Sequence, residues 1–113
     1  MTVFKKIIDG EIPCNKIYED EHILAFHDIN PHAKVHAVVI PKPTHLERLQ
    51  DATETDAALL GHLLIKIPEI AKLLGIDESG YRVITNNGDH AGQEVPHIHF
   101  HILGGEPFGK LRG

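Results

Sequence analysis

The chain has 113 residues, a formal net charge of −5, and 42% hydrophobic against 24% charged residues. This length fits one domain over residues 1–113, and no apolar run approaches the roughly 20 residues that cross a bilayer. An acidic surface repels a polyanion, which argues against nucleic acid as the main partner. Cys14 is the only cysteine, and the first residues lack the apolar core of a signal peptide. We therefore expect a cytoplasmic protein with no membrane partner.

The first half of the chain predicts a short helix followed by three strands. Thr2 can cap a helix with an apolar side, which Gly10 ends. Residues 16–19 and 22–28 form two short strands across a polar turn, which is typical of a hairpin. The β-branched run 35–40 is bounded by prolines and predicts a third, buried strand.

The second half predicts one long helix and two more strands. Residues 53–56 resemble a capping box, and apolar residues then recur at intervals of three and four over 59–74. Pro68 lies inside this helix and is expected to kink it or divide it. Residues 81–86 and 95–103 predict the last strands. The element order favours an α+β fold, a five-stranded antiparallel sheet packed with one long and one short helix.

Ten histidines are the unusual feature of the composition, and three of them alternate with apolar residues near the C-terminus. Side chains of a strand point to opposite faces in turn, so His97, His99 and His101 are expected on one open face, roughly 7 Å apart. The residues between them, Ile98 and Phe100, are expected to pack on the long helix. Imidazole titrates near neutrality, which suits proton transfer, nucleophilic attack or metal binding.

Two chemistries fit this array. A His-x-His pair can supply two zinc ligands, with a third from Cys14, His36 or a carboxylate if the fold brings it near. Alternatively, a neutral imidazole can attack phosphorus while its neighbours donate hydrogen bonds to phosphate oxygens. The residues alone leave both open.

Four segments carry a resemblance to a known family. They are 4–8, 25–31, 36–42 and the motif Gly-Gln-Glu-Val-Pro-His-Ile-His-Phe-His-Ile-Leu-Gly-Gly at 92–105. Together they resemble the histidine triad (HIT) family and are most similar to its Hint branch of nucleotide-binding proteins. The resemblance implies a HIT-like fold, a two-fold homodimer and chemistry that needs no cofactor.

The resemblance also implies an activity. In this family the middle histidine attacks the α-phosphorus of a purine nucleoside phosphoramidate or related adenylyl conjugate. A nucleotidyl-histidine forms, and water then releases an AMP-like nucleoside monophosphate. On this chain the nucleophile is His99. His97 and His101 flank it to orient it and stabilise phosphate charge, and His36 joins a proton relay.

A nucleoside pocket is implied by further matches. Asp28, at a strand end, offers a carboxylate to the two ribose hydroxyls, although the same carboxylate can simply cap the turn that follows. The resemblance places a set of apolar residues around the base, and each of them alone fits ordinary core packing equally well: Phe4, Ile7, Phe26, Ile29 and Val38.

The phosphate side of the pocket is expected in the loops before the histidines. Asn86 matches a family asparagine near the phosphate or leaving group, but it also adjoins an Asn-Gly turn signal. The loop of Gly92, Gln93, Glu94 and Val95 is expected to present backbone N–H groups to the phosphate. Glu94 departs from relatives that have serine, and an ionised carboxylate repels phosphate. Either Glu94 turns away, or it meets a cationic leaving group.

Three hypotheses for the function follow. The first is the hydrolase, the second is a nucleotide-binding regulatory module with incidental turnover, and the third is a zinc-binding domain using His97, His99 and perhaps His36. His45 is interpreted as structural or capping, and Cys14 as a packed small side chain. The other histidines are assigned to the surface: His22, His27, His32, His62 and His90.

Overall fold

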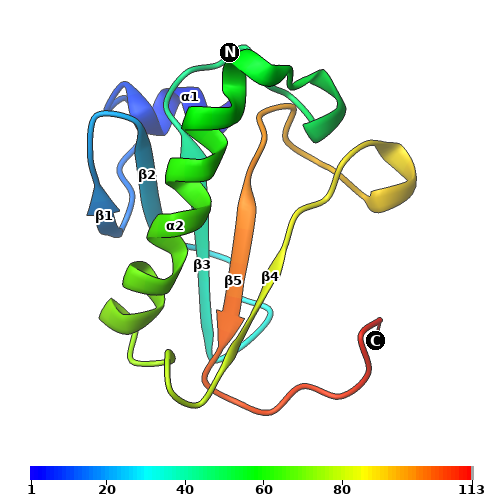
Figure 1. Ribbon diagram of the computed structural model, residues 1–113. Coiled ribbons are helices and arrows are strands. Elements are labelled where there is room, and N and C mark those ends of the chain that lie inside the picture. Colours follow the sequence, from blue (N-terminus) through cyan, green and yellow to red (C-terminus); the bar gives the residue numbers. More distant parts are fainter. Residues whose placement is uncertain (113) are drawn as a thin grey trace.

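The computed structural model describes residues 1–112; Gly113, the last residue of the predicted single domain, lies outside them. The element order of helix, three strands, long helix and two strands is confirmed (Figure 1). The elements are α1 (Val3–Ile8), β1 (Lys16–Glu19), β2 (Ile23–His27), β3 (Val35–Pro41), α2 (Ala57–Leu73), β4 (Tyr81–Ile84) and β5 (Phe100–Gly104). Single 3₁₀ turns at Leu49–Asp51, Glu54–Asp56 and Asp89–Ala91 lie in the connections.

The five strands form one antiparallel sheet in the order β1-β2-β3-β5-β4, which confirms the predicted fold class. After β3 the chain crosses through α2 to the far edge, and β5 then inserts between β4 and β3. The register puts Val38 of β3 opposite both Phe26 of β2 and His101 of β5. Ile84 of β4 is opposite His101 in turn. One row across the sheet therefore joins an aromatic ring, an aliphatic side chain and an imidazole.

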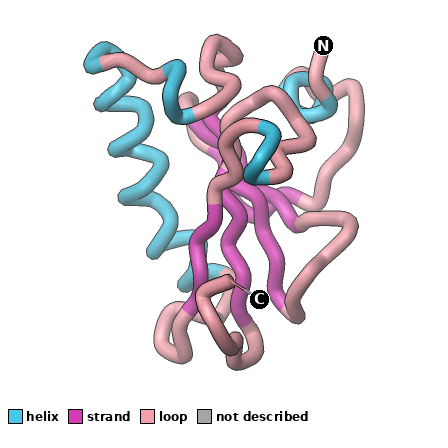
Figure 2. Tube along the Cα trace, turned by 90° about the vertical axis from the view of Figure 1, so that its right-hand side faces the viewer, coloured by secondary structure: helices cyan, strands magenta, loops and turns pink. Residues whose placement is uncertain are grey.

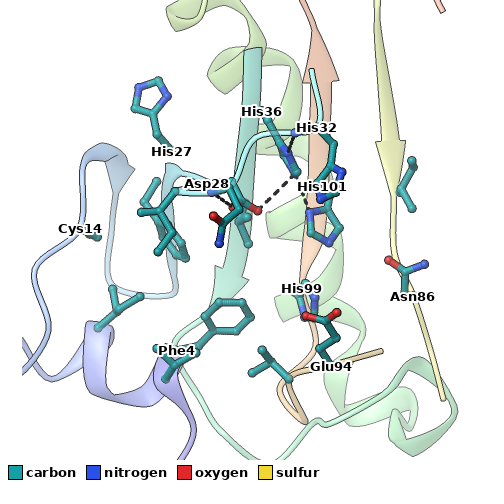
Figure 3. A pocket seen from close by; sticks show the side chains of 18 of the residues that line it. Phe4, Cys14, His27, Asp28, His32, His36, Asn86, Glu94, His99 and His101 are labelled. Atoms are coloured by element: carbon teal, nitrogen blue, oxygen red, sulfur yellow. Dashed lines mark hydrogen bonds and ion pairs between the residues drawn. The ribbon is translucent and has the colours of Figure 1, made fainter. Parts of the chain in front are cut away.

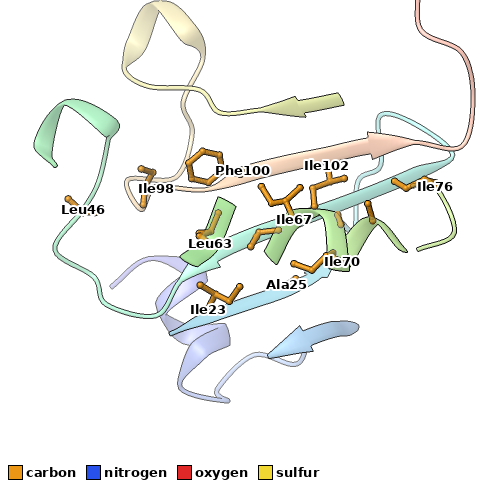
Figure 4. Packing of buried hydrophobic residues seen from close by; sticks show 13 residues of the cluster. Ile23, Ala25, Leu46, Leu63, Ile67, Ile70, Ile76, Ile98, Phe100 and Ile102 are labelled. Carbon is orange, nitrogen blue, oxygen red and sulfur yellow. The ribbon is translucent and has the colours of Figure 1, made fainter. Parts of the chain in front are cut away.

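The two faces of the sheet are covered by different helices (Figure 2). On one face, Leu63, Ile67 and Ile70 of α2 join one cluster with Ile98, just before β5, and Ile102 of β5, as predicted from the alternation (Figure 4). Each such side chain contributes about 1.5–3 kcal/mol when it is fully buried.

The opposite face carries a smaller cluster in which α1 packs on the sheet. It consists of Phe4, Leu24, Phe26, Val38 and Ile40. Thr2 accepts the Lys5 N–H and caps α1, as predicted. The histidine face is therefore not open, contrary to the prediction, because α1 covers it. His97 is 1% exposed and His99 6% exposed.

Two other predictions about the elements are wrong. β5 begins at Phe100 rather than Val95: Pro96 has no N–H, and the Ile98 N–H bonds to the Leu46 carbonyl instead of a neighbouring strand. Of the two outcomes predicted for Pro68, a kink or a division, the division is wrong: the long helix runs unbroken through Pro68, which lies on its exposed side, where water can take the place of the missing hydrogen bond.

The predicted capping box at Thr53 forms, but it starts a 3₁₀ turn that precedes α2 and not α2 itself. The Thr53 N–H bonds to the Asp56 carboxylate and closes a 3₁₀ turn, and Asp56 is then the N-cap residue of α2. No helix among residues 1–112 has the length and apolar character that a bilayer crossing requires.

Candidate active site

A cavity of about 560 Å³ opens on the α1 face, a size typical of small-molecule sites (Figure 3). It brings together most of the residues that the sequence assigned to a site. The predicted residues that line it are Phe4, Ile7, Phe26, Asp28, Ile29, His36, Val38, Asn86, Gly92, Glu94, Val95, His99 and His101. One end is therefore apolar, and the other carries imidazoles, an amide and carboxylates.

His99 lies just before β5 with its ring against Phe4, at a centroid distance of 5.0 Å. Its Nδ1 is 2.7 Å from the carbonyl oxygen of His97, which can only accept, so Nδ1 carries the proton. The lone pair is then on Nε2. Burial lowers the pKa of His99 below its usual value, so the ring is neutral at pH 7. The site therefore holds a neutral imidazole with one defined nucleophilic nitrogen.

His36 and His101 form a second fixed pair, with His36 Nε2 2.9 Å from His101 Nδ1. The backbone N–H of His32 donates to His36 Nδ1 at 3.0 Å, so His36 carries its proton on Nε2 and donates it to His101. His101 in turn keeps its own proton on Nε2. Burial, reinforced by the neighbouring His99 and His36, lowers the pKa of His101 to about 4, and burial also lowers that of His36.

His97 does not line the cavity. Its Nε2 donates to the Pro41 carbonyl at 2.8 Å, and its ring meets the edge of Phe4 at 6.0 Å. Because the His97 carbonyl fixes the tautomer of His99, His97 positions the His99 ring from behind the cavity wall.

Asp28 combines the two uses that the sequence left open. Its Oδ1 accepts the Asn30 N–H at 2.8 Å and caps the turn. Its Oδ2 is 3.4 Å from His36 Nε2 and lies at the cavity wall (Figure 3). One oxygen is therefore structural, and the other faces the site.

The structure does not bring Gln93 into the cavity. Its amide donates to the Glu47 and Val95 carbonyls and accepts the Gly88 N–H, so it ties the loop together. The backbone N–H groups of Gly92 and Gln93 are themselves bonded to the carbonyls of Asp89 and Gly88. Within residues 1–112, no acceptor takes the N–H of Glu94 or Val95, which leaves these two for a ligand.

Asn86 also has a structural bond, from its amide to the Ala91 carbonyl at 2.9 Å, while it lines the cavity. Glu94 borders a second cavity of about 570 Å³ as well as the first. Glu47 and Asp89 line that second cavity, so its charge is predominantly negative.

The cavity also contains residues that the sequence did not predict as part of a site. His27 and His32, which the sequence placed on the surface, also line it; His32 is exposed as predicted, whereas His27 is half-buried. No periodic signal marks His32, which follows Pro31 in an irregular loop and reaches the site only because its backbone bonds to His36. Cys14 is partly buried against the α1-face cluster, as predicted, and burial raises the pKa of its thiol. Other added residues include Ile12, Ile84 and Leu103.

The predicted zinc ligands are not gathered. Among residues 1–112, the one group of three donors whose atoms lie within 4.8 Å of one another includes neither His97 nor His99, so these two rings do not form the expected site. The donor atoms of Asp28, His36 and His101 do lie within 4.8 Å of one another, but hydrogen bonding between the rings accounts for this approach. His45 bonds to the carboxylate of Asp56, the N-cap residue of α2, at 2.6 Å, which favours the structural role of the two that the sequence left open.

Comparisons with known proteins agree with this geometry. Residues 9–108 match the HIT domain. An uncharacterized HIT-like protein from Helicobacter pylori is 53% identical over 106 residues, which are 94% of this chain and 98% of that protein. The crystal structure of a HIT family hydrolase from Legionella pneumophila superposes with a TM-score of 0.95 at 42% identity, covering all of both chains. A histidine triad nucleotide-binding protein from Candida albicans gives a TM-score of 0.81 at 37% identity, over 90% of this chain and 73% of that one.

Proposed function

The chain belongs to the HIT domain family, and from this premise we propose that it cleaves purine nucleoside phosphoramidates, or related adenylyl conjugates, to the nucleoside monophosphate. Its structural neighbours include HIT family hydrolases from Legionella pneumophila and Clostridium thermocellum, and the chain is hydrolase-like. The observation that carries the proposal is the tautomer of His99, whose lone pair is on Nε2 in a cavity of nucleotide size. We assign the chain to the Hint-like branch, as one HIT domain in the cytoplasm.

The nucleoside is proposed to enter with its base at the apolar end. Phe4, Phe26 and Val38 supply flat and aliphatic surface there, and Oδ2 of Asp28 accepts ribose hydroxyls. The α-phosphate then reaches the imidazoles, where the N–H groups of Glu94 and Val95 can bond to its oxygens.

The chemical step begins when His99 Nε2 attacks the α-phosphorus. The phosphorus–nitrogen bond to the leaving group breaks, and the amine departs with a proton from solvent. The positive charge on the nucleotidyl-imidazole is stabilised through Nδ1–H by the His97 carbonyl. Water then attacks the same phosphorus, and the bond between phosphorus and His99 Nε2 breaks. The proton that the water loses returns to solvent and replaces the one that the amine took.

The His36–His101 pair is proposed to serve the transition state as a neutral donor. His101 presents Nε2–H, and its orientation is held by the bond from His36. A neutral donor costs less to bury than an imidazolium and strengthens its bond as charge grows on the phosphate oxygens. In this geometry His36 orients and His101 touches the substrate.

The protein is also proposed to form the two-fold homodimer of its relatives. β4 is an edge strand with Val83 exposed, and α2 exposes Leu64, Ile65 and Leu73. Burying such a surface in a symmetric contact favours a small domain. Sedimentation equilibrium checks this: a monomer at micromolar concentration would contradict it.

The experiment that tests the function combines turnover with intermediate trapping. Adenosine 5′-phosphoramidate is mixed with the protein, release of AMP is followed, and the quenched protein is digested for mass spectrometry. We expect an adenylyl group on the peptide containing His99, none in His99→Ala, and unchanged turnover in the surface control His90→Ala. Tight AMP binding without release would instead support the regulatory module, a role for which the nucleotide-binding name of the Candida protein is the precedent.

A further inference from the structure

A second group of histidines lies on the other side of the sheet from the cavity, where the β1–β2 turn meets α2. His22 is in the turn and His62 is on the helix, and their ring centroids are 5.3 Å apart in an edge-to-face arrangement. From this group we propose a surface site for a divalent late transition metal, with Zn²⁺ as the probe, that joins the turn to the helix through these two imidazoles.

The state of His62 is set by Asp20. Burial opposes the charged form of Asp20, but hydrogen bonds from the His22 N–H, the His62 ring, the Ile23 N–H and the Tyr18 hydroxyl hold its pKa far below its usual range. The carboxylate is therefore ionised and only accepts. His62 Nε2, at 2.7 Å, must donate to it, which leaves the lone pair of His62 on Nδ1.

This arrangement is the one that metal-binding histidines commonly have. A ligating imidazole usually donates its other N–H to a carboxylate, which orients the ring and makes the ligand nitrogen more basic. Asp20 serves His62 in this way, and it also fixes the His22 backbone by accepting its N–H at 2.8 Å. The Asp20 carboxylate thus positions both histidines.

The spacing of the rings fits one shared ion. With Zn–N bonds of about 2 Å and a tetrahedral angle, two ligating imidazoles have centroids about 5 Å apart. The observed separation is 5.3 Å. The His22 side chain is 57% exposed, so much of its ring faces solvent and is accessible to an ion.

A third donor, Glu21, adjoins His22 alone, because the donor atoms of Glu21, His22 and His62 do not all lie within 4.8 Å of one another. The Glu21 carboxylate is 92% exposed, and its Oε2 is 3.9 Å from His22 Nε2. Two imidazoles, one carboxylate and water form a donor set that suits Zn²⁺ and its neighbours in the first transition row, and not the hard ions Mg²⁺ or Ca²⁺. The helix and the turn that supply these donors are 40 residues apart in the sequence, as the pair His22 and His62 shows, so a bound ion would cross-link them.

The test is calorimetric titration of the full chain with zinc chloride, supported by imidazole ¹⁵N NMR. We expect binding to weaken at least tenfold in His22→Ala and in His62→Gln, with ¹⁵N shifts at both rings in the wild type. His45→Gln is the matched control, because His45 has the same bond to an aspartate but no second imidazole opposite. It should bind zinc like the wild type.

A second arm separates this site from the cavity. His36→Gln breaks the group of Asp28, His36 and His101. Zinc binding that survives His36→Gln and is lost in His22→Ala supports the surface site. Binding that is lost in His36→Gln and retained in His22→Ala overturns it, and so does the absence of ¹⁵N shifts at His22 and His62. If His62→Gln fails to fold, the exposed His22 variant and the NMR shifts still decide.

Discussion

The two faces of the sheet are built from alternate residues of one segment, yet they differ in what they bury. On the α2 face, Ile98, Phe100 and Ile102 join a cluster that is entirely apolar. On the α1 face, His97 and His99 are buried to a similar degree, and both are hydrogen-bonded to backbone carbonyls. Burial stabilises the fold on the first face. On the second face it removes charge from imidazoles and fixes their tautomers.

The hydrogen bonds on the α1 face explain why its histidines can be neutral and buried beside a cavity. Each buried ring has a backbone or imidazole partner that accepts one proton or donates one, so burial leaves no polar side-chain atom unsatisfied among the described residues. The α1 face therefore has a defined proton pattern, and the α2 face supplies the stability that holds it.

The largest effect on activity is expected on the α1 face, at His99. His99→Ala should lower kcat by at least about 10³-fold, because removing a catalytic nucleophile leaves only binding and charge stabilisation. Stopped-flow or discontinuous assays of AMP release measure this. A variant that keeps more than a few per cent of the wild-type rate would falsify covalent catalysis by His99.

A substitution at the next residue, Phe100, should instead lower stability and leave the chemistry intact. Phe100→Ala is expected to lower the free energy of unfolding by about 3–5 kcal/mol, because it opens a cavity in the α2-face cluster. Urea denaturation measures the loss, and the folded fraction should keep its specific activity at low temperature. Leu111→Ala, at a position 90% exposed, serves as control and should change stability little. A loss below about 1 kcal/mol in Phe100→Ala would contradict the division between the faces.

Acid should destabilise the protein through the α1 face. The folded pKa of His101 is about 4, below the unfolded value of 6.5, so the unfolded state binds more protons between these pH values. Stability is therefore complete above pH 6.5 and falls as the pH decreases towards 4, by about 1–2 kcal/mol for a partly exposed group. Urea denaturation at several pH values should show this slope, and His101→Gln should flatten it. An equal slope in the variant would assign the effect to other groups.

Within the cavity, Asp28→Asn should have a smaller effect. Asparagine keeps an oxygen for the turn, but it loses the charge that faces the ribose. We expect the preference for ribonucleotides over 2′-deoxy analogues to fall about tenfold, which corresponds to one charge-assisted hydrogen bond. The ratio of kcat/KM values is the measurement. Equal losses for both sugars would show that Asp28 only holds the turn.

The smallest effect is expected at Glu94. Its carboxylate borders both cavities, so a cationic leaving group can lie beside it while a neutral one gains nothing. Glu94→Gln should reduce the preference for an adenosine phosphoramidate with a distal ammonium about two- to fivefold, the range of a solvent-exposed ion pair. Glu78→Gln, in the turn before β4, is the control. An unchanged ratio would place the side chain in solvent.

Much of the fold could be predicted, because the patterns that fix it are local. Thr2 and the apolar period of α2 identify the helices, and the β-branched run after Lys34 identifies the central strand. The start of β5 could not be predicted, since it depends on the Ile98 N–H bonding to Leu46, a residue far away in the sequence. The continuity of α2 through Pro68 depends on which side of the helix faces the sheet.

The candidate site likewise has features that local patterns predict and features that depend on distant contacts. The alternation of His97, His99 and His101 predicts imidazoles on one side of a strand, and the resemblance assigns the rest. Neither indicates that His97 lies behind His99 and outside the cavity, or that the Gln93 amide is used entirely in backbone hydrogen bonds. These roles follow from hydrogen bonds to Pro41, Gly88 and Glu47, which only the folded chain brings near.

The position of Phe4 has a practical consequence for anyone who handles this protein. A six-residue helix does not persist alone, so α1 depends on its cap and on Phe4, which touches Phe26, His97 and His99 at once. α1 is thus a wall of the cavity, although 95 residues separate Phe4 from His99. Any change that unwinds α1, such as the loss of the Thr2 cap, would also alter the packing around the His99 ring. Protein prepared for assays should therefore keep residues 2–8 unaltered.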